Sequence, residues 1–473
     1  MRTFSTTTKR SNLRGIYNSY QYDTSRQVES LWEMEYRRPT DKHLPLSPGE
    51  QVDCKVAIIG AGYTGLSCAL HLVRDYQIKG NDLRVFDAGR ELGWGASGRN
   101  GGFCCMGATH LSSKQMIQQY GLKETQKWMK LQVDAVKLVR SLIEKYQIDA
   151  ELTGDSIVCV AHSSKSYKSF EQEAQELQQL FSIPCTLYPQ YNHGMYGALK
   201  VHVGFGLNPL KYLNGLAEVC QKQYGVKIHQ RSQIIKWDKR NKHHHRLYTD
   251  TGACIQAEKV VIAANGYMPE SLHSSLVGRI MPVLSNIIVT RALTSDELMK
   301  YGKDLINPHY TSRHLLNYYR LLPDSNRFLF GGRGDTYGDV EHGEIMKKQL
   351  LKQFHDLFPL WANQVKITHY WSGLVCFTRN FGPSFGYLNG NDKSVWYSFG
   401  YHANGVNTAT YAGKQLAKYL TLATQSDVKS YLFNDLPHLL VKNGLPPKIP
   451  FSQFRLWYLR VILVFYRLLD YFR

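Results

Sequence analysis

Residues 55–65 read Lys-Val-Ala-Ile-Ile-Gly-Ala-Gly-Tyr-Thr-Gly, and this stretch decides the fold prediction. A short apolar run rich in β-branched residues is followed at once by three glycines and then by a helical pattern of apolar residues. Asp87 ends the next apolar run. This order of strand, glycine turn, helix and strand is typical of a dinucleotide-binding β-α-β unit, in which Asp87 would accept hydrogen bonds from a ribose.

Each residue of the turn has a physical role in such a unit. Gly60 permits the tight turn, Gly62 lets the backbone approach a diphosphate, and Gly65 allows the helix to pack closely on the strand. The helix that opens at Tyr63 and Thr64 offers unpaired N–H groups and the positive end of its dipole. A glycine-rich turn with no ligand is the alternative interpretation.

A second stretch of small residues separates FAD from NAD as the expected cofactor. Residues 95–102 read Gly-Ala-Ser-Gly-Arg-Asn-Gly-Gly, and such a run can pass backbone amides close to a flavin and its phosphate chain. Ser97 and Arg99 are available to neutralise phosphate charge. The predicted cofactor contacts in this stretch are Ala96, Ser97, Arg99, Asn100, Gly101 and Gly102.

Length and composition set the limits of the fold. The chain has 473 residues, 43% of them hydrophobic and 20% charged, which predicts a globular protein of two lobes or two interleaved domains. The formal net charge of +19 is compatible with nucleic acid, an anionic membrane surface, an acidic small molecule or simply a basic, solvated surface. The nine cysteines show neither a CxxC pair nor zinc-ligand spacing, which favours free thiols in a reducing compartment and predicts no metal.

The two ends of the chain are both basic. The first twenty residues contain four basic residues and no acidic one, so a ragged basic arm and a mitochondrial transit peptide are both considered, whereas the absence of an apolar core argues against secretion. Residues 456–472 are nearly all apolar or aromatic, with arginines between them. They predict an amphipathic helix that lies either on a membrane surface or in an apolar groove of the protein itself.

Between these ends the sequence predicts alternating helices and strands. An amphipathic helix is expected over 112–148, a helix-like run follows 201–210, and 226–237 alternates like a strand. The three histidines at 243–245 are expected at the exposed tip of a hairpin rather than around a metal. A further buried strand is expected over 259–264.

Over residues 54–425 the sequence resembles the D-amino-acid oxidase superfamily of FAD-dependent oxidoreductases, and within it the bacterial branch typified by gamma-glutamylputrescine oxidase. Besides the two glycine-rich stretches, the resemblance is carried by Val-Val-Ile-Ala-Ala-Asn-Gly-Tyr at 260–267, by 320–333, by Trp-Ser-Gly at 371–373 with Thr378 and 383–386, and by Gly-Tyr-His-Ala-Asn-Gly-Val at 400–406.

The resemblance implies an α/β fold: a Rossmann-type FAD-binding domain interleaved with an α+β substrate domain whose sheet is mostly antiparallel. The implied division is an arm at 1–53, an FAD-binding domain at 54–110, 205–275 and 370–425, a substrate domain at 111–204 and 276–369, and a basic tail at 426–473. The further cofactor contacts that it implies are Ile234, Ala263, Asn265, Gly266, Gly373, Thr378, Gly400, Asn404, Gly405 and Val406, with Ile234 against the adenine.

The implied activity is oxidation of a C–N bond in an amine or amino acid by hydride transfer to non-covalent FAD, with oxygen or a quinone as acceptor. Arg320 is the candidate anchor for a substrate carboxylate, because a guanidinium binds carboxylates in a bidentate manner; a structural ion pair is its alternative. His402 and Tyr318 are the other candidate catalytic residues. Tyr319 and Tyr267 are candidate pocket walls, and Arg333 would lie near the flavin or cap a strand.

Three positions depart from the family pattern. Ala403 stands where a glycine is usual, Asn380 stands where an aspartate is common, and Cys376 is out of register with the cysteine that some relatives link to flavin. Ala403 and Asn380 make a flavin-binding protein without turnover one rival hypothesis. The net charge suggests another, a flavoprotein that oxidises a base of tRNA as some relatives of this fold do, although no RNA-binding motif supports it. A cytoplasmic location, with or without membrane association, is expected; a mitochondrial one is the alternative.

Overall fold

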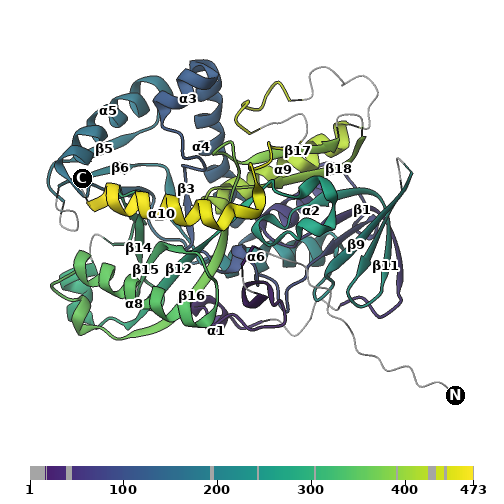
Figure 1. Ribbon diagram of the computed structural model, residues 1–473, viewed down its shortest axis with the longest axis horizontal. Helices are drawn as coiled ribbons and strands as arrows, with labels where there is room; N and C mark the ends of the chain where they lie inside the picture. Colours follow the sequence, from purple (N-terminus) through teal and green to yellow (C-terminus); the bar gives the residue numbers. More distant parts are fainter. Residues whose placement is uncertain are drawn as a thin grey trace.

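Two large β-sheets organise the chain, and they lie side by side (Figure 1). The computed structural model describes residues 16–17, 19–38, 45–191, 196–241, 244–302, 305–389, 392–423, 433–440 and 445–471. One sheet carries the glycine turn, and the other is the mostly antiparallel sheet that the resemblance implied. The predicted α/β class with an interleaved α+β part is confirmed.

The first sheet has a parallel centre built around the β-α-β unit. β1 pairs with β2 on one side and with β11 on the other, and β18 and β8 extend the parallel arrangement. β9 and β10 add an antiparallel ribbon to β11, and β17 pairs antiparallel with β18. The strands are β1 (Gln51–Ile59), β2 (Leu83–Phe86), β8 (Lys227–His229), β9 (Ile234–Asn241), β10 (His244–Thr249), β11 (Cys254–Ile262), β17 (Ser384–Asn389) and β18 (Asp392–Phe399).

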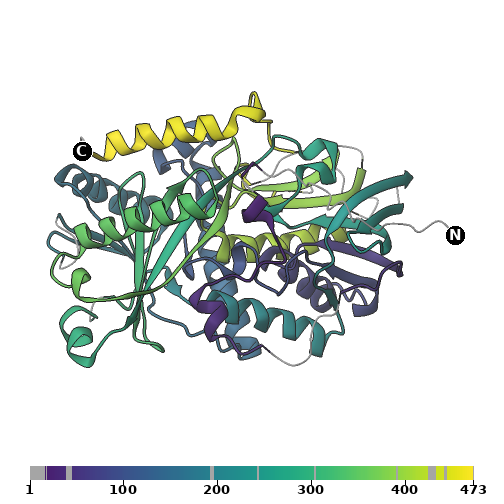
Figure 2. The ribbon, with the colours of Figure 1, turned by 60° about the horizontal axis from the view of Figure 1, so that its bottom comes forward.

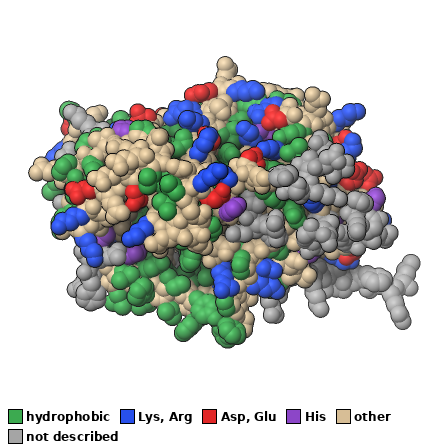
Figure 3. All heavy atoms as spheres, turned by 90° about the horizontal axis from the view of Figure 1, so that it is seen from above, with side chains coloured by type: hydrophobic (Ala, Val, Ile, Leu, Met, Phe, Trp, Pro, Cys, Tyr) green, Lys and Arg blue, Asp and Glu red, His purple; other side chains and the backbone are tan. Residues whose placement is uncertain are grey.

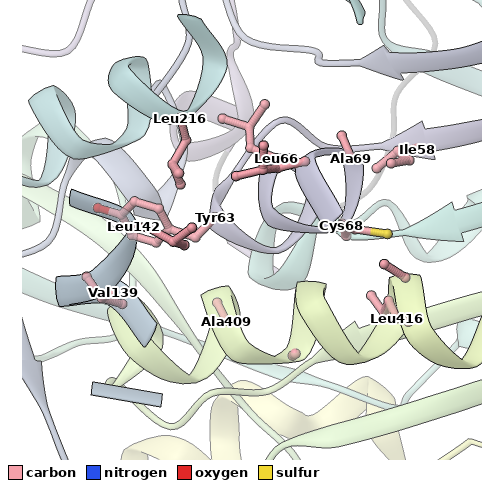
Figure 4. Close-up of a cluster of buried hydrophobic side chains, with 14 of the residues drawn as sticks. Ile58, Tyr63, Leu66, Cys68, Ala69, Val139, Leu142, Leu216, Ala409 and Leu416 are labelled. Atoms are coloured by element: carbon pink, nitrogen blue, oxygen red, sulfur yellow. The ribbon is translucent and has the colours of Figure 1, made fainter. Parts of the chain in front are cut away.

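Helices α2 (Tyr63–Asp75) and α9 (Gly405–Leu422) pack against each other on this sheet (Figure 4). Leu66 and Ala69 of α2 are fully buried in the same cluster as Leu416 of α9. The helices approach closely because α9 has a glycine at the crossing: a Cβ on Gly413 would stand 2.4 Å from the carbonyl oxygen of Thr64. The large apolar stripe on α2 that the sequence predicts is therefore a helix–helix and helix–sheet contact.

The second sheet contains eight strands, antiparallel except where β13 and β4 run parallel. Helix α8 (Val340–Leu357) covers it with an aromatic cluster that includes Phe328, Phe354 and Trp361. In order, the strands are β16 (Ile367–Phe377), β12 (Met281–Ala292), β15 (Arg327–Asp335), β14 (Asn317–Leu322), β13 (His309–Thr311), β4 (Ile157–Val160), β6 (Ala198–Val201) and β5 (Cys185–Tyr188).

The remaining elements connect the two sheets. β3 (Phe103–Cys105) and β7 (Gly204–Gly206) form a small ladder between them. Asn208 caps α6 by accepting hydrogen bonds from the N–H groups of Leu210 and Lys211, and Pro209 occupies the first helical position. The further helices are α1 (Leu31–Glu35), α3 (Ser113–Tyr120), α4 (Leu122–Tyr146), α5 (Ser164–Phe181), α6 (Pro209–Glu218), α7 (Ser295–Glu297) and α10 (Arg455–Tyr471).

Three predicted boundaries are wrong. The helix expected over 112–148 is two helices, because Gly121 adopts φ 83° and ends α3 before α4 begins. The strand expected over 226–237 is interrupted between β8 and β9, where Arg231 takes φ 50°. The division at 370 falls inside β16, which belongs to the second sheet because it pairs with β12 along its length.

The predicted exposed histidine tip is wrong in part. Residues 242 and 243 lie outside the described residues, and His244 begins β10. His245 is fully buried, and its Nε2 lies 2.8 Å from the Ser394 hydroxyl. In the part of the chain that the structure describes, no group of three potential ligands is close enough to hold a metal.

The described part of the N-terminal segment is mostly irregular, apart from two short helical elements, and it packs on the body of the protein. Residues 16–17 and 19–38 precede β1, which already begins at Gln51. The Tyr17 hydroxyl donates to the carbonyl of Pro282, and the Trp32 indole donates to the carbonyl of Asn100. Most of the basic stretch expected at 1–20 lies outside the described residues. None of the described helices is long and apolar enough to cross a bilayer.

Candidate cofactor and substrate site

A cavity of about 1140 Å³ runs from the glycine turn to the face of the second sheet. A binding pocket for a drug-sized molecule occupies roughly 300–1,000 Å³, so this cavity has room for a dinucleotide and a small substrate together. Both sheets contribute to its walls. The lining segments include 59–64, 86–89, 93–97, 263–270, 373–376 and 401–406.

The glycine turn has the geometry that its sequence predicts. Gly60 adopts φ 106°, which favours glycine, and its N–H donates to the carbonyl of Phe86 at the end of β2. A Cβ on Gly65 would stand only 1.9 Å from the carbonyl oxygen of Gly60. The packing role predicted for Gly65 is confirmed, and Gly62 and Tyr63 bring the start of α2 to the cavity wall.

Asp87 lies beside this turn, at the end of β2. Its carboxylate accepts 2.8 Å hydrogen bonds from the N–H groups of Ala61 and Gly89. Burial raises the pKa of Asp87, although both N–H groups act in the opposite direction. A carboxylate has about four acceptor positions, so lone pairs remain for the hydroxyls of a ribose. The ribose role stays a prediction.

Hydrogen bonds of the Asn100 side chain stabilise the conformation of the stretch 95–102. The side-chain amide donates to the carbonyls of Ala96 and Ser97, and its oxygen accepts from the N–H of Gly102. The Ser97 hydroxyl accepts from the N–H of Tyr63, which ties this loop to the first turn of α2. The two glycine-rich stretches therefore form one continuous wall.

Arg99 is buried in this wall, and no carboxylate among the described residues is hydrogen-bonded to it. Its guanidinium donates to the carbonyls of Trp94 and Ser372 and lies 4.3 Å from the centre of the Trp94 ring. Burial lowers its pKa. One nitrogen, Nη2, is buried with no hydrogen-bond partner among the described residues. A buried donor of this kind needs an acceptor, so the cavity here is built to receive one.

A second helix N-terminus faces the same cavity. Asn404 precedes α9, and its side chain donates to the carbonyl of Gly107. His402 and Ala403 take φ 50° and 73°, so the turn before α9 is left-handed at two successive non-glycine residues. A glycine at position 403 would adopt this conformation without strain, so Ala403 carries a backbone cost that a glycine would not.

Most of the predicted cofactor residues are brought together around the cavity. Those that line it are Gly60, Gly62, Tyr63, Thr64, Asp87, Ala96, Ser97, Arg99, Asn100, Gly101, Ile234, Ala263, Asn265, Gly266, Gly373, Asn404, Gly405 and Val406. Gly65, Gly102, Thr378 and Gly400 lie behind the lining. A Cβ on Gly400 would stand 2.3 Å from the Thr378 side chain, so this pair shapes the turn from behind.

Arg320 does not lie in the cavity, which corrects its predicted role. The side chain is only 1% exposed. Its guanidinium donates to the carbonyls of Gly101 and Leu207 and to the Thr153 hydroxyl. Arg320 therefore holds the 95–102 stretch against β7 and α6, and its donors are committed to the protein rather than to a substrate carboxylate.

The other two candidate catalytic residues do reach the cavity. The Tyr318 hydroxyl lies 3.0 Å from the Ser285 hydroxyl, and its ring meets the edge of Phe103. His402 is 2% exposed. Its Nε2 accepts a hydrogen bond from the backbone N–H of Thr378, with 3.3 Å between the two nitrogens. Their catalytic roles stay predictions.

Of the remaining residues predicted to line the site, one lies at the cavity and the others do not. Tyr267 lines the cavity and accepts from the N–H of Leu374. Tyr319 is in the core of the second sheet instead, stacked on His309, so its predicted place is wrong. Asn380 is half-buried and does not line the cavity, and the side chain of Arg333 is outside the described set.

Two groups of cavity residues escaped the sequence analysis. The N-terminal segment contributes Tyr20, Tyr22 and Asp23, and burial raises the pKa of Tyr22. The C-terminal helix contributes Arg455, which forms a bidentate ion pair with Glu270. The only signal in the sequence was the concentration of tyrosines over 17–22 in an otherwise polar arm.

The residues present fit FAD. The turn has no room for a side chain at Gly60, where a Cβ would stand 2.8 Å from the Ala263 carbonyl oxygen, and its backbone lies at the cavity wall next to the α2 N-terminus, where a diphosphate would bind. Asp87 and Ile234 provide a polar and an apolar contact at the same end of the cavity. The unpartnered Nη2 of Arg99 offers a donor farther along, between the Trp94 loop and β16.

Comparison with known proteins also points to an FAD-binding protein. The family model described as FAD dependent oxidoreductase (DAO) matches residues 55–419. The chain is 29% identical over 434 residues to the gamma-glutamylputrescine oxidoreductase of Escherichia coli strain K12, covering 88% of this chain and 95% of that protein. It is also 29% identical over 391 residues to the probable oxidoreductase OrdL of Haemophilus influenzae, covering 79% and 84%.

Among solved structures, glycine oxidase from Geobacillus kaustophilus matches with a TM-score of 0.63 at 19% identity, covering 78% of this chain and 95% of that one. That likeness concerns the fold. The family match spans both glycine-rich stretches, the N-terminus of α9 and the strands between them. The chain therefore belongs to the FAD-dependent oxidoreductase (DAO) family, and FAD is its cofactor.

Proposed function

We propose that this oxidoreductase oxidises the C–N bond of an amine or amino acid, and that an amine whose reacting carbon bears no carboxylate is the preferred substrate. The observation that carries the proposal is the continuity of the cavity: one space connects the glycine turn to an uncharged chamber against the second sheet. Bound FAD would accept a hydride from a C–H group next to nitrogen.

At the nucleotide end, the chain's residues bind and orient. The backbone of Gly60 to Gly65 and the N-terminus of α2 would hold the diphosphate, and Asp87 the ribose. Gly373 and the turn before α9 would lie along the ring system. Burial raises the pKa of the Cys376 thiol, which keeps it protonated and a poor nucleophile, so we expect FAD to be held without a covalent bond.

At the substrate end, the walls are uncharged. Phe103, Ser285, Ile287, Tyr310 and Tyr318 line this part, and the described segments 103–107, 282–287 and 310–318 contribute no acidic or basic side chain to the cavity. A chamber without charged walls disfavours an ammonium group relative to the neutral amine. Hydride transfer requires the neutral amine, so this environment suits the reaction.

The arginines narrow the substrate class. Arg320 is committed to protein acceptors, and Arg455, which does line the cavity, is paired with Glu270. Arg99 also lines the cavity, but it is buried and its remaining donor nitrogen is expected to serve the cofactor rather than a substrate. This arrangement supports a substrate without a carboxylate at the reacting carbon, and a gamma-glutamyl amine, as in the name of the Escherichia coli relative, meets that requirement.

Anaerobic mixing tests the proposal. The purified yellow protein is mixed with polyamines, gamma-glutamyl amines and α-amino acids, and loss of the flavin absorbance is recorded. We expect rapid bleaching by an amine and slow or no bleaching by α-amino acids. Bleaching by α-amino acids alone would contradict the substrate class, and no bleaching by any member of the panel would contradict the reaction.

The electron acceptor is decided by a second measurement. Oxygen and a quinone are the two candidates, and both can take two electrons from the reduced cofactor. Stoichiometric peroxide during aerobic turnover would identify an oxidase. Turnover that needs an added quinone, with little peroxide, would identify a dehydrogenase.

A further inference from the structure

The C-terminal helix α10 has one face on the protein and one face away from it. Leu459 and Leu463 are 6% and 7% exposed and pack with Val283 of β12. The Asp470 carboxylate accepts from the N–H groups of two residues in the loop before β14, His314 and Leu315. Figure 2 shows the helix as a ridge along the edge of the molecule.

The opposite face of α10 is apolar and exposed. A helix turns by about 100° per residue, so Trp457, Val461, Val464 and Leu468 share one stripe. They are 61%, 48%, 56% and 51% exposed. Phe465 is 55% exposed beside them, and Phe451 and Phe454, just before the helix, are 70% and 55% exposed. Figure 3 shows hydrophobic side chains gathered along the lower edge of the molecule in that view.

The charged side chains on the exposed side of α10 are arginines. Arg460 and Arg467 are exposed at its edge, two turns apart on the same side of the helix. The Arg460 guanidinium also lies over the ring of Tyr337 and donates to the carbonyl of Thr336. Asp470, the one acidic residue of α10, is turned toward the protein as a cap for the His314 loop. The sequence as a whole carries a formal net charge of +19. An acidic surface therefore complements this region.

We propose that this outer face of α10 docks on an anionic lipid surface. An exposed helix face rich in tryptophan, phenylalanine and aliphatic residues, with arginines at its edge, is the pattern of helices that lie in a membrane interface. Seventeen residues are too short to span the apolar core of a bilayer. The helix is already folded on the protein body, so docking would require little ordering of the chain.

The proposed docking surface adjoins the cofactor cavity. Arg455 begins α10, is 6% exposed and lines the cavity together with its partner Glu270. Leu456 packs beside Tyr267 and Leu374, which also line it. A bilayer under α10 would therefore lie next to one wall of the cavity. The docking itself does not depend on the proposed substrate or reaction.

Sedimentation with vesicles tests the proposal on the full chain. Protein is mixed with vesicles of phosphatidylcholine, with and without phosphatidylglycerol, at low and high salt. We expect it to sediment with the anionic vesicles and less so at high salt. The double variant R460Q/R467Q should bind at least about tenfold more weakly, because each basic residue near an anionic surface contributes about 1 kcal/mol.

Substitutions of exposed apolar residues test whether this face of α10, rather than any exposed apolar side chain, binds the vesicles. Trp457→Glu with Phe465→Glu should abolish sedimentation, while Met299→Glu with Leu360→Glu should not change it, although Met299 and Leu360 are 63% and 76% exposed. Flavin absorbance and thermal unfolding show that each variant is folded. Absence of binding to anionic vesicles, or equal binding by both double variants, would overturn the proposal. So would a dimer that the α10 variant converts to monomer, since the face would then join two copies.

Discussion

The two ends of the cavity are built in different ways. At the nucleotide end, the glycine turn and Asp87 belong to one β-α-β unit: Asp87 accepts from the N–H of Ala61, and Gly65 packs on the carbonyl of Gly60. At the substrate end, Tyr318 meets Phe103 and Ser285, which come from three distant segments. The geometry of the nucleotide end therefore depends on the spacing of residues within one segment of the sequence. The geometry of the substrate end depends on how the two sheets pack together.

The largest expected effect is at the nucleotide end. A methyl group in Gly65→Ala would stand 1.9 Å from a backbone oxygen, so α2 must move away from β1 at a cost of about 3 kcal/mol or more. We expect the variant to purify without flavin. The control is Gly343→Ala in α8, where the nearest atom is 3.9 Å away and flavin content should be unchanged. A yellow Gly65→Ala protein would show that the close packing is not required.

Arg320 joins the two ends, and its loss should destabilise the fold. Arg320→Met keeps the length of the side chain but leaves the carbonyls of Gly101 and Leu207 buried without these donors. We expect the free energy of unfolding to fall by about 3 to 5 kcal/mol, measured by denaturant titration. Arg231→Met, at a side chain that is 53% exposed, is the control. A raised KM with unchanged stability would restore the role of substrate anchor.

The stability of the nucleotide end should also decrease at acidic pH, because of His71 in α2. This side chain is fully buried, its Nδ1 lies 2.7 Å from the Ser67 carbonyl oxygen, and burial lowers its pKa to about 4. The unfolded chain takes up the proton near pH 6.5 and the native chain does not, so stability is lost as the pH falls from about 6.5 to about 4. The loss approaches about 3 kcal/mol.

His71→Gln should flatten this dependence, measured as the unfolding temperature across that pH range. His438→Gln, at a side chain that is 73% exposed, should show the same dependence of unfolding temperature on pH as the parent protein. Equal profiles for the parent and His71→Gln would assign the acid sensitivity to other groups.

The smallest expected effect is at the turn where the two ends meet. Ala403 adopts φ 73°, which costs an alanine about 1 kcal/mol or more, and glycine would remove that cost while making the unfolded chain more flexible. Ala403→Gly should therefore raise the free energy of unfolding by about 0.5 kcal/mol. Ala135→Gly, in the interior of α4, should lower it. A destabilised Ala403→Gly would indicate that the methyl group makes a packing contact that outweighs the strain.

The sequence by itself determined the β-α-β unit, FAD as the expected cofactor and the existence of the C-terminal helix. The glycine spacing and the position of Asp87 act within one supersecondary unit, where the periods of helix and strand fix which groups meet. For the helix, the apolar and basic pattern of 456–472 was enough to predict Arg455–Tyr471 closely.

Only the tertiary structure decided which side chains face the cavity. Tyr318, Tyr319 and Arg320 are consecutive in β14, and alternation along a strand puts neighbours on opposite faces without saying which face is which. The pairing of β14 with β15 and β13 turns Tyr318 to the cavity and Tyr319 to the core, and it leaves Arg320 bound to Gly101. The contribution of residues 19–20 and 22–25 to the cavity wall was likewise undetermined, because contacts with β12 and the 95–102 stretch join parts of the chain that no local pattern relates.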